Sequence, residues 1–451
     1  MKGSLLRFYS DPIRSLHRMR PLGNVVAFSR GSTAVVAAFG PENNRALLAD
    51  TKRFYNFAKA PFSIPKDCGL ARLTSGLVAM SGERHRVQRR LMMPAFTKQA
   101  IAAHRDAMVE VASRRIARWR AGDVVDARAE MVELTLLVAM RCLFGLDVEG
   151  EARALGAMTS RAMDGLVNPW NILFPVPLPG TPLRRYLDDS DRTEQRMRGL
   201  IQDARAREGG TDVLALLCRA QDEDGASLTE QELIGHTMTV FVASHETTAF
   251  TLAWTLFLLA ENPGVLHALR EELSGALRGE APTVEQLDAL PLLDAVLRES
   301  MRLLPATPVL FLRVAQEATV LGAHALGPGT HVALSPLMTH REPSLYPEPL
   351  SFRPSRWDDA SVGPYDYLPF GAGPRLCLGA GFANQALRMV LPLILQRFEP
   401  ELLPNARIDP KVRGITMGPA NELPIRLRAI GSTARTVLAG GRIRELVAAP
   451  Q

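Results

Sequence analysis

A long irregular segment that leads to a single cysteine is the feature that most constrains how this chain of 451 residues folds. Residues 342–376 are repeatedly interrupted by Pro and Gly, so neither a helix nor a strand can continue through them. Irregular segments of this length are uncommon in compact domains and are usually functional or disordered. The segment runs into FGAGPRLCLG, residues 370–379, just before a helical pattern. The sequence therefore predicts a functional loop with Cys377 at the start of a helix.

The residues around Cys377 favour its thiolate form. At a helix N-terminus, backbone N–H groups lower the pKa of a thiol below its free value of about 8.5. Arg375 adds positive charge two residues before the cysteine. The loop glycines, among them Gly371 and Gly379, let backbone approach a flat group closely. Such a thiolate is suited to act as a ligand. These residues alone also allow an inert thiol, or a nucleophile that uses one of the nine His as its base.

The rest of the chain predicts a mainly α protein with a small β region. Apolar residues at three- and four-residue spacing indicate helices, whereas short β-branched runs after Pro305 indicate strands. Thr229 and Glu232 form a capping box, and Thr211 and Asp212 mark another helix start. The helical ranges are 41–50, 82–96, 98–146, a run ending near 207, 229–261, 291–304 and 378–398.

Two further segments carry specific expectations. Residues 168–182 hold five Pro and predict a loop, while residues 414–427 predict a closing hairpin. No linker or internal repeat divides the chain, so we expect one domain over residues 1–430 and a loosely attached tail over 431–451.

Composition excludes several other classes of protein. With 47% hydrophobic and 22% charged residues the chain is of ordinary globular make-up, and its four Cys form no CxxC pair. The N-terminus lacks the apolar core of a signal peptide, which predicts a cytoplasmic protein with free thiols. The net charge of +6 comes mainly from Arg dispersed along helices, which favours solvated faces over a nucleic-acid surface.

The longest nearly uncharged stretch, residues 236–260, has the length of a membrane span. It contains His236, His245, Glu246 and six Thr, which are costly next to lipid. The composition indicates a helix through the middle of a soluble protein, without a membrane anchor.

FGAGPRLCLG resembles the heme-binding signature of the cytochrome P450 family. The signature has five fixed positions, and all of them match: Phe370, Gly373, Arg375, Cys377 and Gly379. A chance match somewhere in a chain of this length has a probability on the order of 10⁻⁴. The resemblance implies the single-domain P450 fold, heme b (iron protoporphyrin IX) and Cys377 as the ligand of its iron, with Phe370, Gly371, Arg375 and Gly379 beside the cofactor.

A second pair of segments is similar to the family's structural motif. LRESMRLLP places Glu299 and Arg302 one turn apart on a helix, and FRPSRW supplies Arg356. The resemblance implies that the three side chains form a buried network that holds the Cys377 loop. A surface ion pair is the alternative interpretation.

The motif ASHETTA, residues 243–249, matches the family's oxygen-activation motif within the long helix. The resemblance implies that Ala243 faces the heme and that Glu246 and Thr247 are catalytic, through proton delivery and oxygen binding. The alternative is that the Thr hydroxyl bonds only to its own helix. Ser244 stands where the family usually has Gly, so the groove there is expected to be narrower or differently wetted.

Four basic residues match family positions that hydrogen-bond the heme propionates. They are His85 and Arg89, four residues apart on one helix, together with Arg313 and Arg375. A solvated charged helix face is the alternative.

The resemblance implies a heme-thiolate monooxygenase that hydroxylates or epoxidises an apolar small molecule with O2, in bacterial secondary metabolism. A peroxide-driven peroxygenase and a non-catalytic heme sensor or carrier are the alternatives. Electrons are expected from an acidic ferredoxin or flavodoxin with an NAD(P)H-dependent reductase, docking near Arg86 and Arg90 on a monomer.

The substrate is the least determined feature. Besides the loop 69–80, family position assigns the pocket to Phe241, Val242, Val309, Leu310, Thr416 and Met417. These residues are mostly apolar, which indicates an apolar or mixed molecule and leaves fatty acids, terpenoids, steroids and polyketides open. The Pro-rich segment 168–182 is expected to act as a mobile lid.

Overall fold

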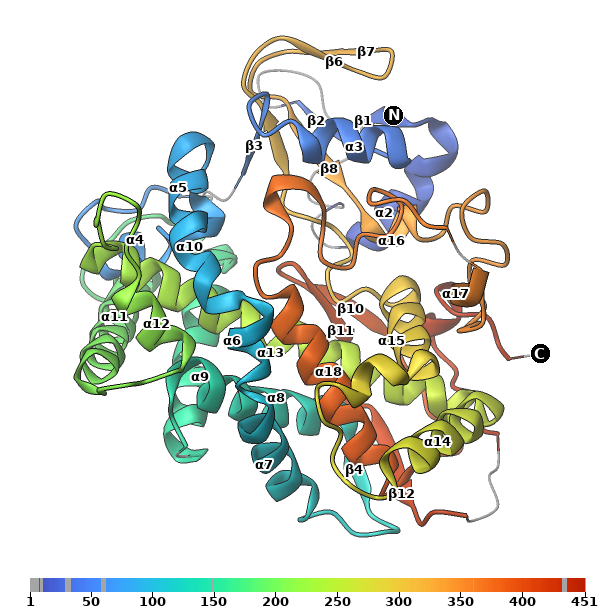
Figure 1. Cartoon of the computed structure of the whole chain (residues 1–451). Coiled ribbons are helices and arrows are strands. Elements are labelled where there is room, and N and C mark those ends of the chain that lie inside the picture. Colours follow the sequence, from blue (N-terminus) through green and yellow to red (C-terminus); the bar gives the residue numbers. More distant parts are fainter. Residues whose placement is uncertain are drawn as a thin grey trace. The chain divides into compact units, whose positions relative to one another are not determined.

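The computed structural model describes residue 8 and residues 11–28, 34–57, 62–147, 149–359, 361–431 and 436–450. The chain divides into two compact units. Figure 1 shows their helices and strands, coloured along the sequence. Unit 1 comprises residues 1–55, 108–134 and 247–451, and unit 2 comprises residues 56–107 and 135–246. Three helices continue from one range into the other: α7 (Arg105–Ile116), α8 (Ala127–Phe144) and α13 (Glu230–Glu261).

Unit 1 holds the Cys377 segment and the β structure. Its other helices are α2 (Pro12–Met19), α3 (Pro41–Ala49), α14 (Pro263–Leu277), α15 (Pro291–Leu303), α16 (Pro336–Thr339), α17 (Arg356–Asp359) and α18 (Ala380–Leu395), with the 3-10 turns η1 (Arg20–Leu22), η4 (Gln286–Ala289), η5 (Gly373–Arg375) and η6 (Arg442–Glu445).

Four small sheets accompany these helices. A five-stranded sheet has the order β1-β2-β8-β5-β3, and β2 runs parallel to β8. The other sheets are β4-β12-β9, β6-β7 and β10-β11. The strands are β1 (Val25–Ala27), β2 (Val35–Ala38), β3 (Phe54–Asn56), β4 (Val124–Asp126), β5 (Arg313–Ala315), β6 (Thr319–Leu321), β7 (His324–Leu326), β8 (His331–Leu334), β9 (Glu399–Leu402), β10 (Pro410–Arg413), β11 (Thr416–Pro419) and β12 (Pro424–Arg428).

The described part of unit 2 is mainly helical. It consists of α4 (Gly69–Leu73), η2 (Leu77–Ala79), α5 (Gly82–Met92), η3 (Met93–Phe96), α6 (Lys98–Ala102), α9 (Glu149–Leu166), α10 (Pro169–Leu173), α11 (Pro182–Ala206) and α12 (Val213–Arg219).

The capping signals of the sequence are confirmed. The Thr229 N–H donates to Glu232 Oε2 at 3.1 Å, and the Glu232 N–H donates to Thr229 Oγ1 at 3.3 Å. Asp212 caps α12 by accepting a hydrogen bond from the Ala215 N–H at 3.0 Å. Reciprocal bonds of this kind satisfy N–H groups that have no partner within the helix.

Three local predictions are wrong. The run 98–146 is interrupted by a turn at Gly122, whose φ of +98° suits glycine, and by β4. Residues 168–182 contain the short helix α10, because Pro169 occupies the first turn, where its missing N–H does no harm. Residues 414–427 do not form a hairpin of their own, since β11 pairs with β10 and β12 pairs with β9 and β4.

The expectation of a loosely attached tail is also wrong for the described residues 436–450. Ile443, Leu446 and Val447 are buried. The Ala439 N–H donates to the buried carboxylate of Glu261 at 2.8 Å, and Arg444 pairs with the same group. Apolar burial and an internal ion pair therefore fix this segment, although the domain boundary at residue 430 stays a prediction.

Among the residues that the structure describes, no single helix combines the length and the apolar character needed to cross a membrane. Within this described part of the chain, α13 and α14 meet both requirements only when taken together, and they are bent by 112° at the break between them.

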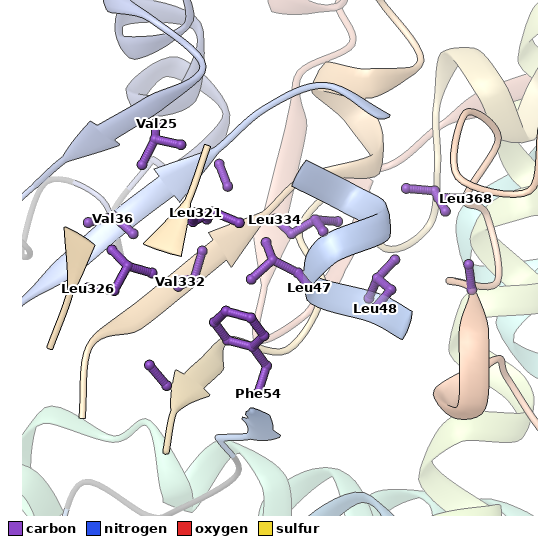
Figure 2. Close-up of a cluster of buried hydrophobic side chains, with 13 residues drawn as sticks. Val25, Val36, Leu47, Leu48, Phe54, Leu321, Leu326, Val332, Leu334 and Leu368 are labelled. Atoms are coloured by element: carbon purple, nitrogen blue, oxygen red, sulfur yellow. The ribbon is translucent and has the colours of Figure 1, made fainter. Parts of the chain in front are cut away.

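A hydrophobic cluster of unit 1 positions the end of the irregular segment. It joins the five-stranded sheet and α3 to Leu368 and Ala372, which lie just before Cys377. Figure 2 shows Leu47 on the strand side of α3 and Leu48 on the side of Leu368. The segment lacks regular structure here, yet it is held by close packing against α3.

Candidate active site

The backbone of the Cys377 loop closes on itself by hydrogen bonds. The Cys377 N–H donates to the Phe370 carbonyl at 2.9 Å, and the Leu376 N–H donates to the Gly373 carbonyl at 2.9 Å. The thiol is exposed, and α18 begins three residues later at Ala380. The loop therefore presents sulfur outward at a helix start, where positive partial charge stabilises a thiolate.

Two glycines are required by the shape of this loop. Gly371 and Gly373 both have φ of +70°, a conformation that other residues rarely adopt. A Cβ on Gly373 would lie 2.4 Å from the Leu48 carbonyl oxygen. The loop can thus approach α3 this closely only with glycine at position 373.

A single buried carboxylate organises the segment upstream of the loop. Glu299 on α15 accepts two hydrogen bonds from Arg302, Nε at 2.8 Å and Nη2 at 2.9 Å. Arg356 Nε adds a third at 2.9 Å, and Trp357 Nε1 adds a fourth at 3.1 Å. The Arg353 N–H completes the shell at 3.0 Å. Both Glu299 oxygens are satisfied, as a buried charge requires.

Arg302 extends this network to the irregular segment. Its Nη1 donates to the carbonyls of His340 and Pro349, each at 2.8 Å, and its Nη2 donates to the Ser351 carbonyl at 3.2 Å. The fully buried guanidinium thereby supplies hydrogen bonds to backbone carbonyls that have no partner in a helix or a strand. The predicted buried network of Glu299, Arg302 and Arg356 is present in unit 1, and a surface ion pair is excluded.

His340 connects Arg302 to the Cys377 loop. Its Nδ1–H donates to the Arg302 carbonyl at 3.2 Å, and its Nε2 accepts from the Leu368 N–H at 2.8 Å. Burial, together with the charges of Arg302 and Arg341, lowers the pKa of His340 to about 3. The ring is therefore neutral, as its acceptor role requires.

Arg313 and Arg375 form a positive site in unit 1. Arg313 on β5 is buried and donates to the Phe311 carbonyl at 3.0 Å. Burial and the charge of Arg375 lower the pKa of Arg313 to about 10. Two guanidinium groups that repel each other in this way suit a bound anion such as a carboxylate.

Unit 2 carries a second group of predicted residues on α5. His85 is buried and Arg89 is half-buried, one turn apart on this helix. Gln88 lies between them and donates to Glu232 Oε1 at 2.9 Å, while its own Oε1 accepts from His236 Nε2 at 2.8 Å. Burial lowers the pKa of His236 to about 4, so this ring is neutral as well. The chain of polar groups fixes α5 to α13 within unit 2.

The oxygen-activation motif lies in an unbroken part of α13. Ala243 is exposed, whereas Glu246 and Thr247 are half-buried. The Ser244 hydroxyl donates to the Phe241 carbonyl at 2.9 Å, and His245 Nδ1 approaches the same carbonyl at 3.1 Å. Ser244 therefore turns back onto its own helix, and its hydroxyl is occupied there.

The predicted substrate residues differ in exposure. Phe241 and Met417 are fully buried, and Phe241 packs against Phe144 with ring centroids 5.6 Å apart. Leu310 is partly buried, and its Cδ1 lies 3.9 Å from where a Cβ on Gly371 would be. The remaining candidates are Val242 and Val309, which are half-buried, and Thr416, which is buried.

Residues 69–80, which were expected to form a loop, contain α4 and the turn η2 and approach α13 closely within unit 2. A Cβ on Gly76 would lie 2.2 Å from the Gly235 carbonyl oxygen, so glycine is needed at this crossing. The role of all these residues as substrate contacts stays a prediction.

The site residues fall into two groups by unit. Unit 1 brings together the Cys377 loop, the Glu299 network, and Arg313 with Arg375, and unit 2 contains His85, Arg89, Ala243 and Glu246. His340 and Trp357 were missed from the sequence, because a lone His or Trp carries no motif signal. Trp357 follows Arg356 directly, which is the only hint that the sequence gives.

The residues of unit 1 fit a heme bound through a thiolate. The exposed thiol at a helix start is a suitable iron ligand, and the mutually repelling Arg313 and Arg375 suit propionate groups. Because Gly371 and Gly373 have no side chains, the backbone of the loop is uncovered at these two positions.

Comparisons with known proteins agree with this chemistry. The family model for "Cytochrome P450" matches residues 3–425. Cyclooctatin synthase of Streptomyces melanosporofaciens is 32% identical over 436 residues, which is 94% of this chain and 93% of that protein. Cyclooctat-9-en-7-ol 5-monooxygenase of the same organism is 30% identical over 423 residues, or 90% of this chain and 89% of that protein.

A solved structure described as retinoic acid bound cyanobacterial CYP120A1 has the same fold. It aligns with a TM-score of 0.84 at 23% sequence identity and covers 94% of this chain and 96% of that chain. The mainly α fold class with small sheets is therefore confirmed.

Proposed function

Because this chain belongs to the cytochrome P450 family, a family of heme-thiolate monooxygenases, we propose that it hydroxylates or epoxidises an apolar small molecule of secondary metabolism. O2 is the oxidant, and the electrons come from a separate acidic ferredoxin or flavodoxin with an NAD(P)H-dependent reductase. The enzyme acts as a monomer in the cytoplasm.

The observation that carries the proposal is the Cys377 loop of unit 1. An exposed thiol stands at a helix start, and the backbone upstream is tied to Glu299 through Arg302 and His340. A rigid loop of this kind holds a ligand sulfur in one orientation, which a structural or solvent-exposed cysteine does not need.

Heme b held by a thiolate supplies the capacity to activate O2 and to oxidise unactivated C–H bonds. In this chain Cys377 would hold the iron, with Phe370, Gly371 and Gly379 beside it. Arg313, Arg375, His85 and Arg89 would hold the propionates, since guanidinium groups donate bidentate hydrogen bonds to carboxylates.

The protein's own task is to position the substrate and to deliver protons. Glu246 and Thr247 are half-buried neighbours on α13, and we assign proton delivery to them. The Ser244 hydroxyl already donates to the Phe241 carbonyl, so it can accept a hydrogen bond from water but does not donate one. Ala243, the exposed small residue of the motif, leaves room on the heme side.

The names of the relatives favour one of the substrate classes left open by the sequence. Cyclooctatin synthase and cyclooctat-9-en-7-ol 5-monooxygenase are named for carbocyclic compounds. Val309 and Leu310 are partly exposed apolar candidates that suit such a skeleton, and Leu310 lies beside Gly371 of the Cys377 loop. We therefore assign a cyclic terpenoid hydrocarbon or alcohol as the substrate.

The test is turnover of a cyclic terpenoid panel by the purified enzyme with NADPH, ferredoxin and reductase. Substrate binding is followed by the spin-state shift of the Soret band. We expect product with the reductase system and a much lower yield with hydrogen peroxide alone. Thr247→Ala is expected to reduce product formed per NADPH, because proton delivery is disturbed while binding remains.

Two outcomes favour the alternatives. Product with peroxide alone at an undiminished rate would identify a peroxygenase. Spectral binding without any product, with Thr247→Ala changing only ligand affinity, would identify a sensor or carrier.

A further inference from the structure

The hairpin of β10 and β11 carries two of the predicted substrate residues, Thr416 and Met417. The two strands form a separate two-stranded sheet in unit 1. A two-stranded hairpin is only marginally stable by itself in water, so its position depends on contacts with other elements. The elements that it contacts therefore decide where these two residues lie.

Met417 forms hydrogen bonds outside the hairpin with both of its backbone groups. Its N–H donates to the Ala306 carbonyl at 2.8 Å, and its carbonyl accepts a hydrogen bond from Trp254 Nε1 at 3.0 Å. Met417 is paired with Val412 of β10. In an antiparallel ladder every second pair makes no bonds across the strands, so its N–H and C=O groups point to the outer edge. Trp254 and Ala306 occupy this edge of β11.

The bond from Trp254 is a purely tertiary contact. Trp254 lies on α13, and the two residues that the bond joins are 163 positions apart in the chain. Trp254 and Met417 are both fully buried. Loss of the indole N–H would leave the Met417 carbonyl without this donor in a place that water does not reach, and a buried unsatisfied carbonyl is costly. The hairpin is thus expected to move when this donor is removed.

Phe250 contacts the same hairpin one turn earlier on α13. A Cβ on Gly418 would lie 2.8 Å from the Cε2 and Cζ atoms of the Phe250 ring. Residues four apart lie on one face of a helix, so Phe250 and Trp254 present one surface to β11. Thr247 lies seven residues before Trp254, which is two turns or about 10 Å along the helix axis. The hairpin is therefore held at a fixed height relative to a residue to which we assign proton delivery.

The Met417 N–H links the hairpin to the second predicted substrate segment. Its acceptor, Ala306, lies four residues before Leu310. Leu310 in turn lies beside Gly371 of the Cys377 loop, with its Cδ1 atom 3.9 Å from where a Cβ on that glycine would be. The contacts thus run without a break from α13 through the hairpin to the loop that holds the candidate ligand.

We propose that Trp254 is a positioning residue that determines which part of the substrate is oxidised. By holding the Met417 carbonyl it fixes residues 416–418 and 306–310 relative to α13. Because Trp254 is fully buried, it acts through Met417 and does not touch the substrate. A displacement of about 1 Å can change a rate roughly a hundredfold, so one such bond is sufficient to select a carbon atom. This inference rests on the proposed function and adds to it a residue that determines its specificity.

The chain offers a matched control for this residue. Trp254→Phe removes the N–H and keeps an aromatic ring. Trp119 is also buried in unit 1, and its Nε1 also donates at 3.0 Å, to Glu130 Oε2, so Trp119→Phe is the control. Trp254→His is the conservative variant, because it retains a ring N–H. Gly418→Ala displaces the hairpin from the other side, since the added methyl group would overlap Phe250.

Two measurements on the holoenzyme require no substrate. Hydrogen–deuterium exchange should be faster over residues 410–419 in Trp254→Phe than in the parent or in Trp119→Phe. Imidazole and 4-phenylimidazole serve as probes that both bind heme iron, and only the second needs room for an apolar group. The Kd of 4-phenylimidazole, read from the Soret band, is expected to rise roughly threefold or more in Trp254→Phe and Gly418→Ala, while that of imidazole stays within about twofold.

Turnover of limonene tests the orientation of a bound molecule. This cyclic terpenoid hydrocarbon has both double bonds and allylic C–H bonds, so it can give an epoxide or an allylic alcohol. We expect the ratio of these products to change roughly threefold or more in Trp254→Phe. It should stay unchanged in Trp119→Phe and return toward the parent value in Trp254→His. A product ratio does not depend on the amount of folded enzyme, so a general loss of stability does not alter it.

Several results would overturn the proposal. One is an unchanged ratio of the two azole Kd values in Trp254→Phe and Gly418→Ala. Another is an unchanged product ratio when the parent oxidises limonene, and a third is an equal change in Trp119→Phe. If the parent binds both azoles but forms no product, the proposed function fails while the azole ratio still decides the role of Trp254. If Trp254→Phe does not bind heme, Trp254→His and Gly418→Ala decide by the same ratios.

Discussion

The Nε2 atom of His340 accepts a hydrogen bond from the Leu368 N–H at 2.8 Å, and this bond joins the Glu299 network to the Cys377 loop. The other ring nitrogen of His340 bonds the Arg302 carbonyl at 3.2 Å. A chain of four groups, Glu299, Arg302, His340 and Leu368, therefore runs from a buried carboxylate to a point nine residues before the cysteine. Hydrogen bonds from these side chains hold the irregular segment in place, as backbone hydrogen bonds hold helices and strands.

Replacement of His340 tests this connection. His340→Phe leaves the Leu368 N–H without its partner in a buried place, and we expect a loss of stability of about 1–3 kcal/mol and faster loss of heme. His340→Gln retains an acceptor and should recover part of both. Urea unfolding and heme transfer to apomyoglobin measure the two effects. His324→Gln, at an exposed position, is the control, and equal behaviour of the His340→Phe variant and this control would contradict the role.

The Glu299 network provides a matched pair of arginines. Arg356 contacts Glu299 through its buried side chain, whereas Arg353 contributes only its backbone N–H and directs its side chain to Glu348 at the surface. Arg356→Gln should destabilise the protein by roughly 3–5 kcal/mol, because it leaves a buried charge short of a partner. Arg353→Gln should cost at most about 1 kcal/mol. Thermal unfolding of both variants checks the difference, and similar losses would refute a buried network.

Stability is expected to fall as the pH drops from about 6.5 toward 3. The folded pKa values of His340 and His236 are about 3 and about 4, below the ordinary 6.5. Below pH 6.5 the unfolded chain binds protons that the folded chain excludes, so protons favour unfolding. Each histidine lowers the free energy of unfolding by at most about 1.4 kcal/mol per pH unit.

Urea unfolding at about pH 7.5 and about pH 5 measures this slope, in a window where carboxylates stay mostly ionised. The double variant His340→Gln, His236→Gln should reduce the slope, and an unchanged slope would show that these rings are not the source. His324→Gln serves as the control, since this residue is exposed.

The cysteine itself is tested by its spectrum. The reduced protein with carbon monoxide should show the strongly red-shifted Soret band of a thiolate-bound heme, and Cys377→Ala should abolish that band. Cys68→Ala is the control, because its thiol donates to the Pro65 carbonyl at 3.1 Å in unit 2. Persistence of the band in the Cys377→Ala variant would remove the basis of the assignment.

The predicted docking site of the electron donor is tested by removing two positive charges. Arg86 and Arg90 are exposed on α5 and pair with Glu83 and Glu223 at 2.6 and 3.4 Å. The double variant Arg86→Gln, Arg90→Gln should raise the KM for an acidic ferredoxin several-fold and weaken its salt dependence, while kcat at saturation changes little. Arg192→Gln on α11 is the control. If the two variants behave alike, the docking face lies elsewhere.

The local structure could be predicted where local chemistry decides it. The Thr229–Glu232 capping box and the Asp212 cap start helices where the sequence places them, because their bonds join residues only three apart. The hairpin over 414–427 was wrong because β12 pairs with β4, about 300 residues earlier in the chain, and no local pattern encodes such a partner. The tail was misjudged for the same reason, since its anchor is Glu261.

The sequence by itself determined the family, the identity of the candidate ligand Cys377 and the helical class, because motif spacing and apolar periodicity are properties of neighbouring residues. Only the tertiary structure decided that His340 and Trp357 complete the Glu299 network, and that Trp254 donates to the Met417 carbonyl. Contacts between residues far apart in the chain, and the burial of each side chain, arise from packing, which a linear pattern does not contain.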